Sequence, residues 1–409
     1  MKLLQLIALI TLLFACKNNS ETSETKDVRN IDAYLDTPFI QEYHEGFIVD
    51  EKIREANDIR AIQPDKNDNI WIATKNGIYM KNPDSRQWEL MITGTDQGPS
   101  YDIKVDGQGN VWIAAWDGIY TNISGKIEKL NGPKPPLAKV VVADEGIYAL
   151  GPHGIWLYQN DAWEKKNYST GRSMRAAVSD GKGGLWIGTD VGLYHCSDEK
   201  TNVFQDNDEL ISAYVHGLDF SDQGDLWVGN LGGVAIRNAT GKIGEKLPED
   251  GITNAWVNVV KRSPEGTMWV GTNYGITRFT PGESAYSVRL SRRWLMSNEV
   301  RDIAFDKDGN AWVATAKGVS AIKKQEMTLA QKADYFYKLL IQRHVRDPWI
   351  VNRFRLNVPG DTTTIEQSDD DNDGEYTSMY LAMESFRYAT TKNPEAKERA
   401  KKAFDFLHY

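Results

Sequence analysis

The stretch that decides the fold is Gly224-Asp225-Leu226-Trp227-Val228-Gly229-Asn230-Leu231-Gly232-Gly233-Val234, because versions of it recur along most of the 409-residue chain. In six versions a tryptophan is followed six residues later by a glycine. These pairs are Trp71/Gly77, Trp112/Gly118, Trp186/Gly192, Trp227/Gly233, Trp269/Gly275 and Trp312/Gly318. A seventh, degraded version has Tyr148 and Gly154 at the same spacing. Successive aromatic residues lie 36 to 43 residues apart. A repeat of about 40 residues built from strands and tight turns is typical of a β-propeller or a solenoid.

Each copy predicts a four-stranded antiparallel sheet. An alternating strand such as residues 300–305 leads into a polar turn rich in Asp, Asn and Gly, which favour hairpin geometry. A strand that is apolar on both faces follows, such as residues 226–228. A turn with glycine leads into a third strand, and a fourth strand has a less clear sequence pattern. A single sheet cannot bury both of its faces. When sheets pack side by side, burial of each large aromatic side chain contributes about 2–3 kcal/mol of stability. The predicted fold class is therefore mainly β, a seven-bladed β-propeller over residues 37–325, with a short C-terminal α-helical region.

The last copy lacks its own outer strand, because the chain runs from Ile322 into Lys323-Lys324-Gln325 and then a helix. The segment Phe39 to Tyr43, upstream of the first copy, has the character of a strand. We predict that residues 39–43 pair with the copy around Trp312 and close the ring, since closure removes exposed sheet edges.

The repeat resembles the two-component regulator propeller family. The likeness is nearly literal at Gly184-Leu185-Trp186-Ile187-Gly188-Thr189-Asp190-Val191-Gly192-Leu193-Tyr194 and covers about residues 55–323. The resemblance implies an extracytoplasmic sensor domain, several of which detect glycan fragments. The chain departs from the hybrid histidine kinases of that family because neither a transmembrane helix nor a kinase follows the repeats. Phosphotransfer is therefore not expected.

The N-terminus predicts export and lipid anchoring. Met1-Lys2 supplies a positive start, and residues 3–14 form an apolar run shorter than a bilayer span. Leu13-Phe14-Ala15-Cys16 resembles a bacterial lipobox, in the style of Bacteroidetes lipoproteins, so we assign 1–16 to a signal peptide with Cys16 acylated. A cleaved signal with a chance cysteine is the alternative. Residues 17–36 are expected to form a flexible tether. The protein would then sit outside the cytoplasm, in the periplasm or at the cell surface.

Residues 326–409 change period and predict three helices. Leu329, Ala333, Phe336 and Leu340 share one helical face; a second helix covers 377–392, and Asn393-Pro394 opens a third. The segment from Asp373 to Tyr388 is similar to helical (α/α) toroid regions that follow such propellers in longer carbohydrate-associated proteins. We therefore expect 326–409 to be a partial helical domain, a truncated toroid.

The net charge and the cysteine content of the chain limit the ligands and partners that it is expected to bind. The net charge of −9 argues against non-specific nucleic-acid binding, although a local Arg/Lys pocket could still hold an anionic sugar. Cys16 and Cys196 are the two cysteines of the chain. Acylation of Cys16 leaves no disulfide, and Cys196 beside His195 is interpreted as a filler at a strand end rather than a zinc ligand.

The densest acidic cluster covers residues 368–374. Asp369, Asp371 and Asp373 imitate the start of an EF-hand calcium loop, but the glutamate that a full loop requires is replaced by Tyr380. Calcium bound by these three aspartates is the one cofactor hypothesis.

Two other interpretations of this cluster stay open. It can be an acidic loop that caps the following helix, because anions suit a helix N-terminus. Alternatively, Asp373 or Glu375 can be the acid of a glycosidase, protonating a leaving oxygen while a second carboxylate acts opposite.

On the propeller, the turns between second and third strands and the loops entering each first strand should share one rim around the central funnel. Flat aromatics beside Arg, Asn and Asp suit a sugar ring, which stacks on an aromatic face and hydrogen-bonds through its hydroxyls. The candidate ligand-binding residues are Lys75, Trp116, Asp117, His153, Arg172, Arg175, Tyr214, His216, Asn230, Trp256, Asn273, Tyr274 and Lys317. Asn57, Tyr101, Asp190 and Asn298 belong to the same rim. For any one of them, ordinary rim packing is the competing interpretation.

Three functions remain in play. The leading hypothesis is non-catalytic recognition of a glycan or glycan fragment. The second is a glycan-active enzyme, either a glycoside hydrolase of the helical region or a polysaccharide lyase with His153 or His216 as base. The third is a protein-docking platform. Fold alone decides none of these.

Overall fold

The computed structural model describes residues 36–93, 100–170, 173–198, 200–205, 209–280, 282–346, 349–358 and 361–408. The signal peptide with Cys16, residues 17–35 of the tether and Arg172 lie outside the described residues. The chain divides into two compact units, residues Gln41–Gln325 and a second unit that includes Glu326–Tyr409.

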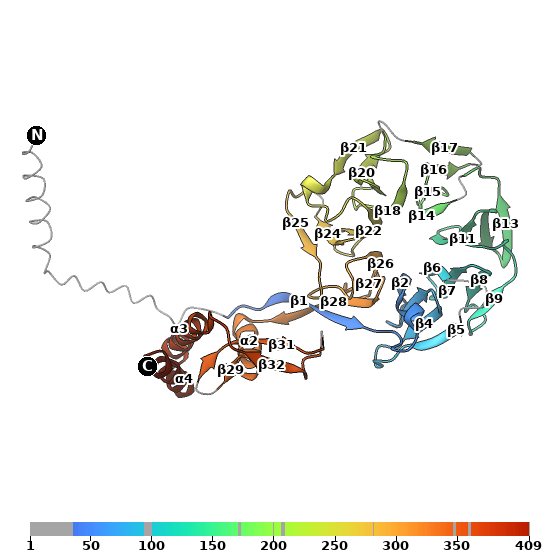
Figure 1. The fold of residues 1–409 in the computed structure, drawn as a ribbon. Helices are drawn as coiled ribbons and strands as arrows, with labels where there is room; N and C mark the ends of the chain where they lie inside the picture. The colour runs from blue at the N-terminus through green and yellow to red at the C-terminus, as the bar shows by residue number, and fades with distance from the viewer. Residues whose placement is uncertain are drawn as a thin grey trace, which may run out of the picture. The chain divides into compact units, whose positions relative to one another are not determined.

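The first unit is a β-propeller whose described part contains seven four-stranded sheets arranged in sequence order around a central axis (Figure 1). The first three blades use β2 (Ile59–Pro64), β3 (Ile70–Thr74), β4 (Gly77–Lys81) and β5 (Glu89–Thr93); β6 (Ser100–Val105), β7 (Val111–Ala115), β8 (Gly118–Thr121) and β9 (Glu128–Leu130); and β10 (Lys139–Ala143), β11 (Gly146–Gly151), β12 (Gly154–Gln159) and β13 (Ala162–Lys166).

The next three blades use β14 (Met174–Ser179), β15 (Leu185–Thr189), β16 (Gly192–Ser197) and β17 (Lys200–Phe204); β18 (Val215–Phe220), β19 (Leu226–Asn230), β20 (Gly233–Asn238) and β21 (Gly241–Lys246); and β22 (Val257–Arg262), β23 (Met268–Thr272), β24 (Gly275–Phe279) and β25 (Tyr286–Arg289). Two 3-10 turns, η2 (Arg54–Asn57) and η3 (Pro248–Asp250), precede blades 1 and 6.

Blade 7 contains β26 (Val300–Phe305), β27 (Ala311–Thr315) and β28 (Gly318–Met327), and its fourth strand is β1 (Phe39–Phe47). The strand predicted at 39–43 therefore exists, is longer than expected, and pairs with β28 of the Trp312 blade. The Phe47 ring stacks on Trp312 with centroids 5.7 Å apart. The prediction of a ring closed by an N-terminal strand is confirmed.

The repeated Asp-x-x-Gly-Asn turn is held by its aspartate. In blade 7, Asp306 Oδ2 accepts from Trp312 Nε1 and Asn310 Nδ2, each at 3.0 Å, while Oδ1 accepts from the amides of Asn310 and Asp308. Blades 1 and 2 repeat this arrangement with Asp65 and Asp106. One carboxylate thus fixes the hairpin and also satisfies the indole nitrogen of a buried ring, which explains its spacing of six residues from the tryptophan.

We expect Asp306→Ala to lower the free energy of unfolding by about 2 kcal/mol, because it removes four hydrogen bonds and leaves the Trp312 indole without an acceptor. The matched control is Ser221→Ala, since Ser221 holds the same place in blade 5 and, among the described residues, its Oγ accepts a single hydrogen bond, from the Asp225 amide at 3.2 Å. Urea unfolding of both variants checks this. Equal losses would contradict the assigned role of the aspartate.

The C-terminal unit contains the three predicted helices, α2 (Leu329–Arg343), α3 (Asp373–Thr391) and α4 (Pro394–His408). It also contains two hairpins that the sequence analysis did not anticipate, β29 (Val345–Arg346) with β30 (Ile350–Val351) and β31 (Arg353–Leu356) with β32 (Ile365–Ser368). Its small core is centred on Val351, Tyr380 and Ala403.

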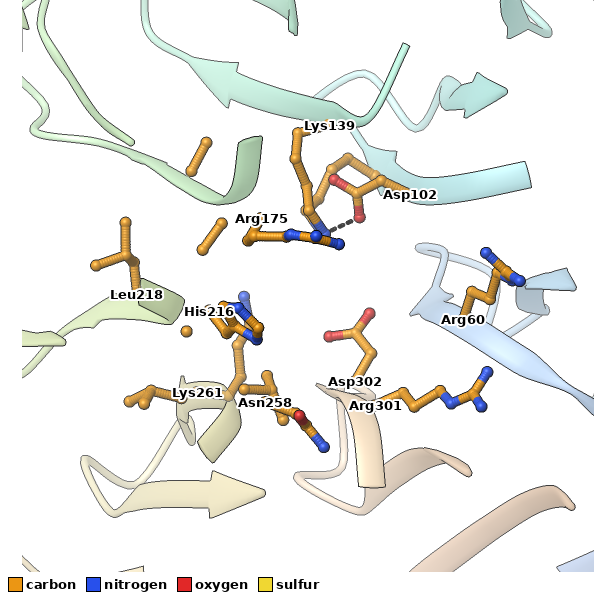
Figure 2. A pocket seen from close by; sticks show the side chains of 16 residues that line it. Arg60, Asp102, Lys139, Arg175, His216, Leu218, Asn258, Lys261, Arg301 and Asp302 are labelled. Atoms are coloured by element: carbon orange, nitrogen blue, oxygen red, sulfur yellow. Dashed lines mark hydrogen bonds and ion pairs between the residues drawn. The ribbon is translucent and has the colours of Figure 1, made fainter. Parts of the chain in front are cut away.

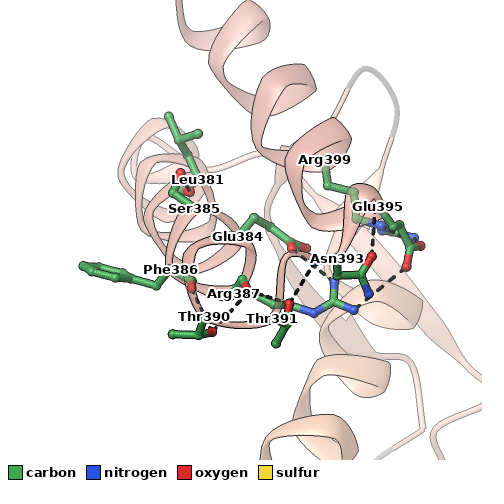
Figure 3. Close-up of polar contacts among 10 residues, drawn as sticks. All are labelled: Leu381, Glu384, Ser385, Phe386, Arg387, Thr390, Thr391, Asn393, Glu395 and Arg399. Atoms are coloured by element: carbon green, nitrogen blue, oxygen red, sulfur yellow. Dashed lines mark hydrogen bonds and ion pairs between the residues drawn. The ribbon is translucent and has the colours of Figure 1, made fainter. Parts of the chain in front are cut away.

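A buried charge lies where α3 meets α4. Glu384 is fully buried and its Oε2 accepts from Arg387 Nη1 at 3.2 Å, while Arg399 pairs with Glu395 at 2.8 Å (Figure 3). The Arg387 guanidinium also lies 4.1 Å from the centre of the Tyr337 ring. The contact with Tyr337 joins α3 to α2, and Arg387 also pairs with Glu395 of α4 at 3.9 Å.

None of the helices in the described ranges is both long and apolar enough for a membrane crossing.

Candidate functional site at the mouth of the channel

The turns between second and third strands and the loops entering the first strands meet at one end of the blades. Backbone hydrogen bonds join them directly: the Lys75 amide donates to Asp58 O, Leu231 to Tyr214 O and Asn273 to Trp256 O, each at 3.2 Å. The predicted common rim therefore exists.

A β-bulge opens the inner strand of six blades at its second residue. The register of β2, β6, β14, β18, β22 and β26 skips one residue between the first and third positions. A bulged residue is left out of the ladder and its side chain is re-aimed. We call these residues, together with Lys139 of the unbulged strand β10, the mouth ring. Its members are Arg60, Tyr101, Lys139, Arg175, His216, Asn258 and Arg301.

The mouth ring opens on a central cavity of about 170 Å3, shown in Figure 2. Six mouth-ring residues line it together with deeper residues of the inner strands, among them Asp102, Lys104, Lys261 and Asp302. The cavity is thus polar and lined chiefly by cations near its mouth.

Three aspartates of the inner strands each accept a hydrogen bond from a backbone amide of the neighbouring blade. Asp102 Oδ2 accepts from the Val140 amide at 3.1 Å, Asp302 Oδ2 from Ile62 at 3.0 Å and Asp219 Oδ2 from Arg262 at 2.9 Å. Asp102 also pairs with Lys104 at 3.1 Å. Burial alone would raise the pKa of Asp102, but the two lysines Lys104 and Lys139 and the Val140 amide outweigh it and hold the pKa below its ordinary value.

Blades 4, 5 and 6 bring five rim residues into one group, which we call the aromatic–arginine cluster: Arg175, Asp190, Tyr214, His216 and Trp256. Arg175 pairs with Asp190 through two hydrogen bonds of 2.9 and 2.8 Å, and His216 Nε2 lies 3.3 Å from the same carboxylate. The His216 ring meets Tyr214 and Trp256 edge to face, with centroids 6.4 and 6.0 Å apart. Tyr214 and Trp256 remain 47% and 40% exposed.

The environment of His216 favours the neutral imidazole, because its pKa lies below the ordinary value. Burial lowers its pKa, the neighbouring Arg175 lowers it further, and the Asp190 carboxylate opposes these effects without overcoming them. A neutral ring whose Nε2 donates to Asp190 leaves Nδ1 as an acceptor.

The other predicted rim residues are more dispersed. Lys75, Trp116, His153, Asn273, Tyr274 and Lys317 are exposed in their turns. Asp117 is engaged by the Tyr120 hydroxyl at 2.7 Å and Lys129 at 3.1 Å. Asn230 is fully buried and its amide donates to Ser212 O at 2.7 Å, so it serves the fold. His153 lies in the exposed β11–β12 turn, outside the residues that line the cavity with His216.

The acidic candidates of the C-terminal unit lie at the start of α3. Asp373 is buried and its Oδ2 accepts from the Asp370 amide at 3.0 Å, so it stabilises the helix start; Glu375 is exposed. Asp369 forms an ion pair with Arg346. Within the described residues no group of three His, Cys, Asp or Glu side chains is placed to hold a metal ion, so the calcium hypothesis finds no assembled ligand set.

The predicted rim did not include four residues that line the cavity: Arg60, Lys139, Asn258 and Arg301. Each stands at or beside the second position of an inner strand, the same position as Tyr101, Arg175 and His216, which were noticed. Aligning the seven inner strands column by column would have grouped them. The bulge is followed by two adjacent buried residues, such as Ala61-Ile62 and Val259-Val260, so it interrupts the alternation of the strand.

Comparisons with known proteins agree with this fold. The family model described as two component regulator propeller matches residues 55–76 and 295–317. No curated protein matches the chain in sequence.

Solved structures give the fold at low identity. Virginiamycin B lyase from Staphylococcus aureus matches at 15% identity and a TM-score of 0.56, covering 70% of this chain and 99% of that one. The extracellular domain of a putative one component system from B. thetaiotaomicron matches at 14% and 0.57, covering 68% of this chain and 39% of that one. The WD40 propeller domain of Doa1 matches at 13% and 0.57, with 70% and 97% covered. An enzyme, an extracellular domain and a WD40 domain thus share this architecture, so the likeness shows the fold alone.

Proposed function

We propose that this protein is an extracytoplasmic, lipid-anchored module that binds a glycan fragment at the mouth of its propeller. The observation that carries the proposal is the aromatic–arginine cluster: two half-exposed aromatic rings stand beside a histidine, an arginine and a carboxylate. An aromatic face takes the CH face of a sugar, and the polar groups orient its hydroxyls. The matching extracellular domains of Bacteroides systems favour the same location outside the cytoplasm.

The lipid anchor at Cys16 and the toroid character of the helical unit belong to this proposal. Both rest on sequence resemblance: the Leu13-Phe14-Ala15-Cys16 lipobox for the anchor, and the Asp373 to Tyr388 segment for a carbohydrate-associated toroid. An anchor of this kind would hold the propeller at a membrane surface, where glycan fragments arrive from outside.

We expect Trp256→Ala and Tyr214→Ala each to weaken oligosaccharide binding about tenfold, a change of about 1.4 kcal/mol, because each removes one stacking face. A calorimetric screen of the chain from residue 27 against plant, algal and host oligosaccharides measures this. Tyr286→Ala on the outer strand β25, with a similarly exposed ring, should leave binding unchanged. If no sugar binds and one defined protein binds through the same face, the ligand is a protein and the glycan proposal is wrong.

A second candidate is a lyase, because burial lowers the pKa of His216 and Asp190 orients its ring beside Arg175, as for a general base facing an acidic sugar. The solved lyases of this fold make such chemistry compatible with a propeller. Examining the same incubations for an unsaturated product separates the two functions, since a binding module releases none and a lyase loses its product with His216→Ala.

A further inference from the structure

The mouth ring is a cationic circle in an acidic protein. The chain carries a net charge of −9, yet the seven positions of the ring hold four cations, no carboxylate, and three uncharged residues. A row of one charge sign at the end of a narrow channel focuses the electrostatic potential there.

Two of these cations already use part of their hydrogen-bonding capacity on carboxylates. Arg301 pairs with Asp58 and Glu299 on the rim. Arg175 gives Nε and Nη2 to Asp190, which leaves its Nη1 edge without an acceptor from that carboxylate.

Lys139 is different, because within the described residues its ammonium makes no hydrogen bond or ion pair. Its side chain lines the cavity, and its charge acts on both Asp102 and His216. Lys139 and Arg175 come from the inner strands of neighbouring blades, and both line the cavity (Figure 2).

The acidic groups of the cavity are engaged by other partners. Asp102 is occupied by Lys104 and the Val140 amide. Asp302 accepts from the amides of Ile62 and Ile303 at 3.0 and 2.9 Å. Both carboxylates thus hold blades together, and within the described residues neither forms an ion pair with Lys139 or Arg175.

We propose that Lys139 and Arg175 form an oxyanion seat that receives a carboxylate or sulfate group of an acidic sugar. This proposal rests on the proposed glycan binding and specifies its substrate class. The cavity of about 170 Å3 is smaller than the roughly 300–1,000 Å3 of a complete ligand pocket. One charged substituent therefore enters the channel while the sugar rings stay at the mouth, against Tyr214 and Trp256. Charge-assisted hydrogen bonds from a lysine and a guanidinium edge suit such an oxyanion.

Lys139→Gln tests the seat, because it removes a cation without leaving a partner unpaired. The control is Lys126→Gln, which makes the same charge change on an exposed residue outside the channel. Calorimetry on the chain from residue 27 compares a uronate trisaccharide, a sulfated trisaccharide and the neutral trisaccharide of the same linkage. Thermal unfolding in sodium sulfate against sodium chloride of equal ionic strength probes the seat without any sugar.

We expect at least tenfold weaker binding of one acidic trisaccharide by Lys139→Gln, unchanged binding of the neutral one, and sulfate stabilisation that Lys139→Gln loses and Lys126→Gln keeps. Whether the uronate or the sulfated sugar responds identifies the oxyanion. Equal binding of neutral and acidic sugars, insensitive to Lys139→Gln, overturns the seat but leaves glycan binding standing. Sulfate stabilisation through Lys139 without binding of any oligosaccharide retains the seat and overturns both the sugar and the proposed function.

Discussion

Glu42→Gln should lower the free energy of unfolding of the propeller by about 3 kcal/mol. Glu42 lies on the closing strand β1, which pairs with blade 7, but its carboxylate reaches blade 6 and accepts from Arg278 and Arg289. Only 15% of its side chain is exposed. Neutralising one partner of a largely desolvated ion pair leaves the other charges uncompensated, which costs more than the pair contributes. The effect is large because one side chain links the last two blades.

The neighbouring residue Glu45 provides a matched control on the same strand. It pairs with Lys323 at 2.7 Å but is 42% exposed, so Glu45→Gln should cost less than about 1 kcal/mol. Twelve of the thirteen tryptophans lie between Gln41 and Gln325, so tryptophan fluorescence in urea follows this unit. Equal losses for the two variants would show that β1 closes the ring by backbone pairing alone.

The Glu42 difference should also depend on pH. Burial alone would raise the pKa of Glu42, but the hydrogen bonds from Arg289 and Arg278 outweigh it and hold the pKa below its ordinary value. A carboxylate with a lowered folded-state pKa contributes stability above its unfolded pKa of about 4.3 and loses it as the pH falls through the folded value. The gap between the natural protein and Glu42→Gln should therefore be full at pH 7 and shrink below about pH 4.

The repeat made the propeller predictable because its signal is written seven times. The aromatic–glycine spacing predicted the blade count, and the missing outer strand of the last copy predicted β1. The hairpins β29 to β32 escaped notice because they are two to four residues long and carry charged residues such as Arg346 and Arg353. Strands this short show no readable period.

The candidate site was predictable only in part, for a physical reason. Exposed aromatics such as Tyr214 and Trp256 break the core pattern and can be read from the sequence. Whether a polar rim residue faces a ligand or the fold depends on contacts distant in the chain, as the buried amide of Asn230 shows. The placement of the cationic side chains around the cavity depends on β-bulges, whose register is defined only once the strands are paired. Long-range geometry therefore decided the electrostatics of the site.

Gly217→Ala should destabilise the propeller by about 3 kcal/mol. A Cβ at Gly217 in β18 would lie 2.7 Å from the Val260 nitrogen and 2.9 Å from the Val259 carbonyl carbon, both backbone atoms of the adjoining inner strand β22. Backbone atoms cannot swing away as a side-chain tip can, so the two strands must separate, and overpacking of this kind costs about 1–3 kcal/mol or more. Urea unfolding measures the loss.

Gly244→Ala is the control, because a Cβ there meets no atom within 4 Å and its backbone needs no left-handed conformation. That substitution should stay within about 0.5 kcal/mol of the natural protein. If Gly217→Ala is equally mild, the close approach of β18 and β22 is not a constraint on the fold.

The same substitution should also weaken ligand binding, because of where Gly217 lies in the repeat. At its position the other bulged inner strands carry Ala61, Asp102, Ala176, Val259 and Asp302, so close backbone approach is peculiar to the seam between blades 5 and 6. That seam holds His216 and Trp256 with their rings 6.0 Å apart. Widening it separates the stacking face from the polar groups beside it. Weakened oligosaccharide binding by folded Gly217→Ala, measured by calorimetry, would connect blade packing directly to the geometry of the site.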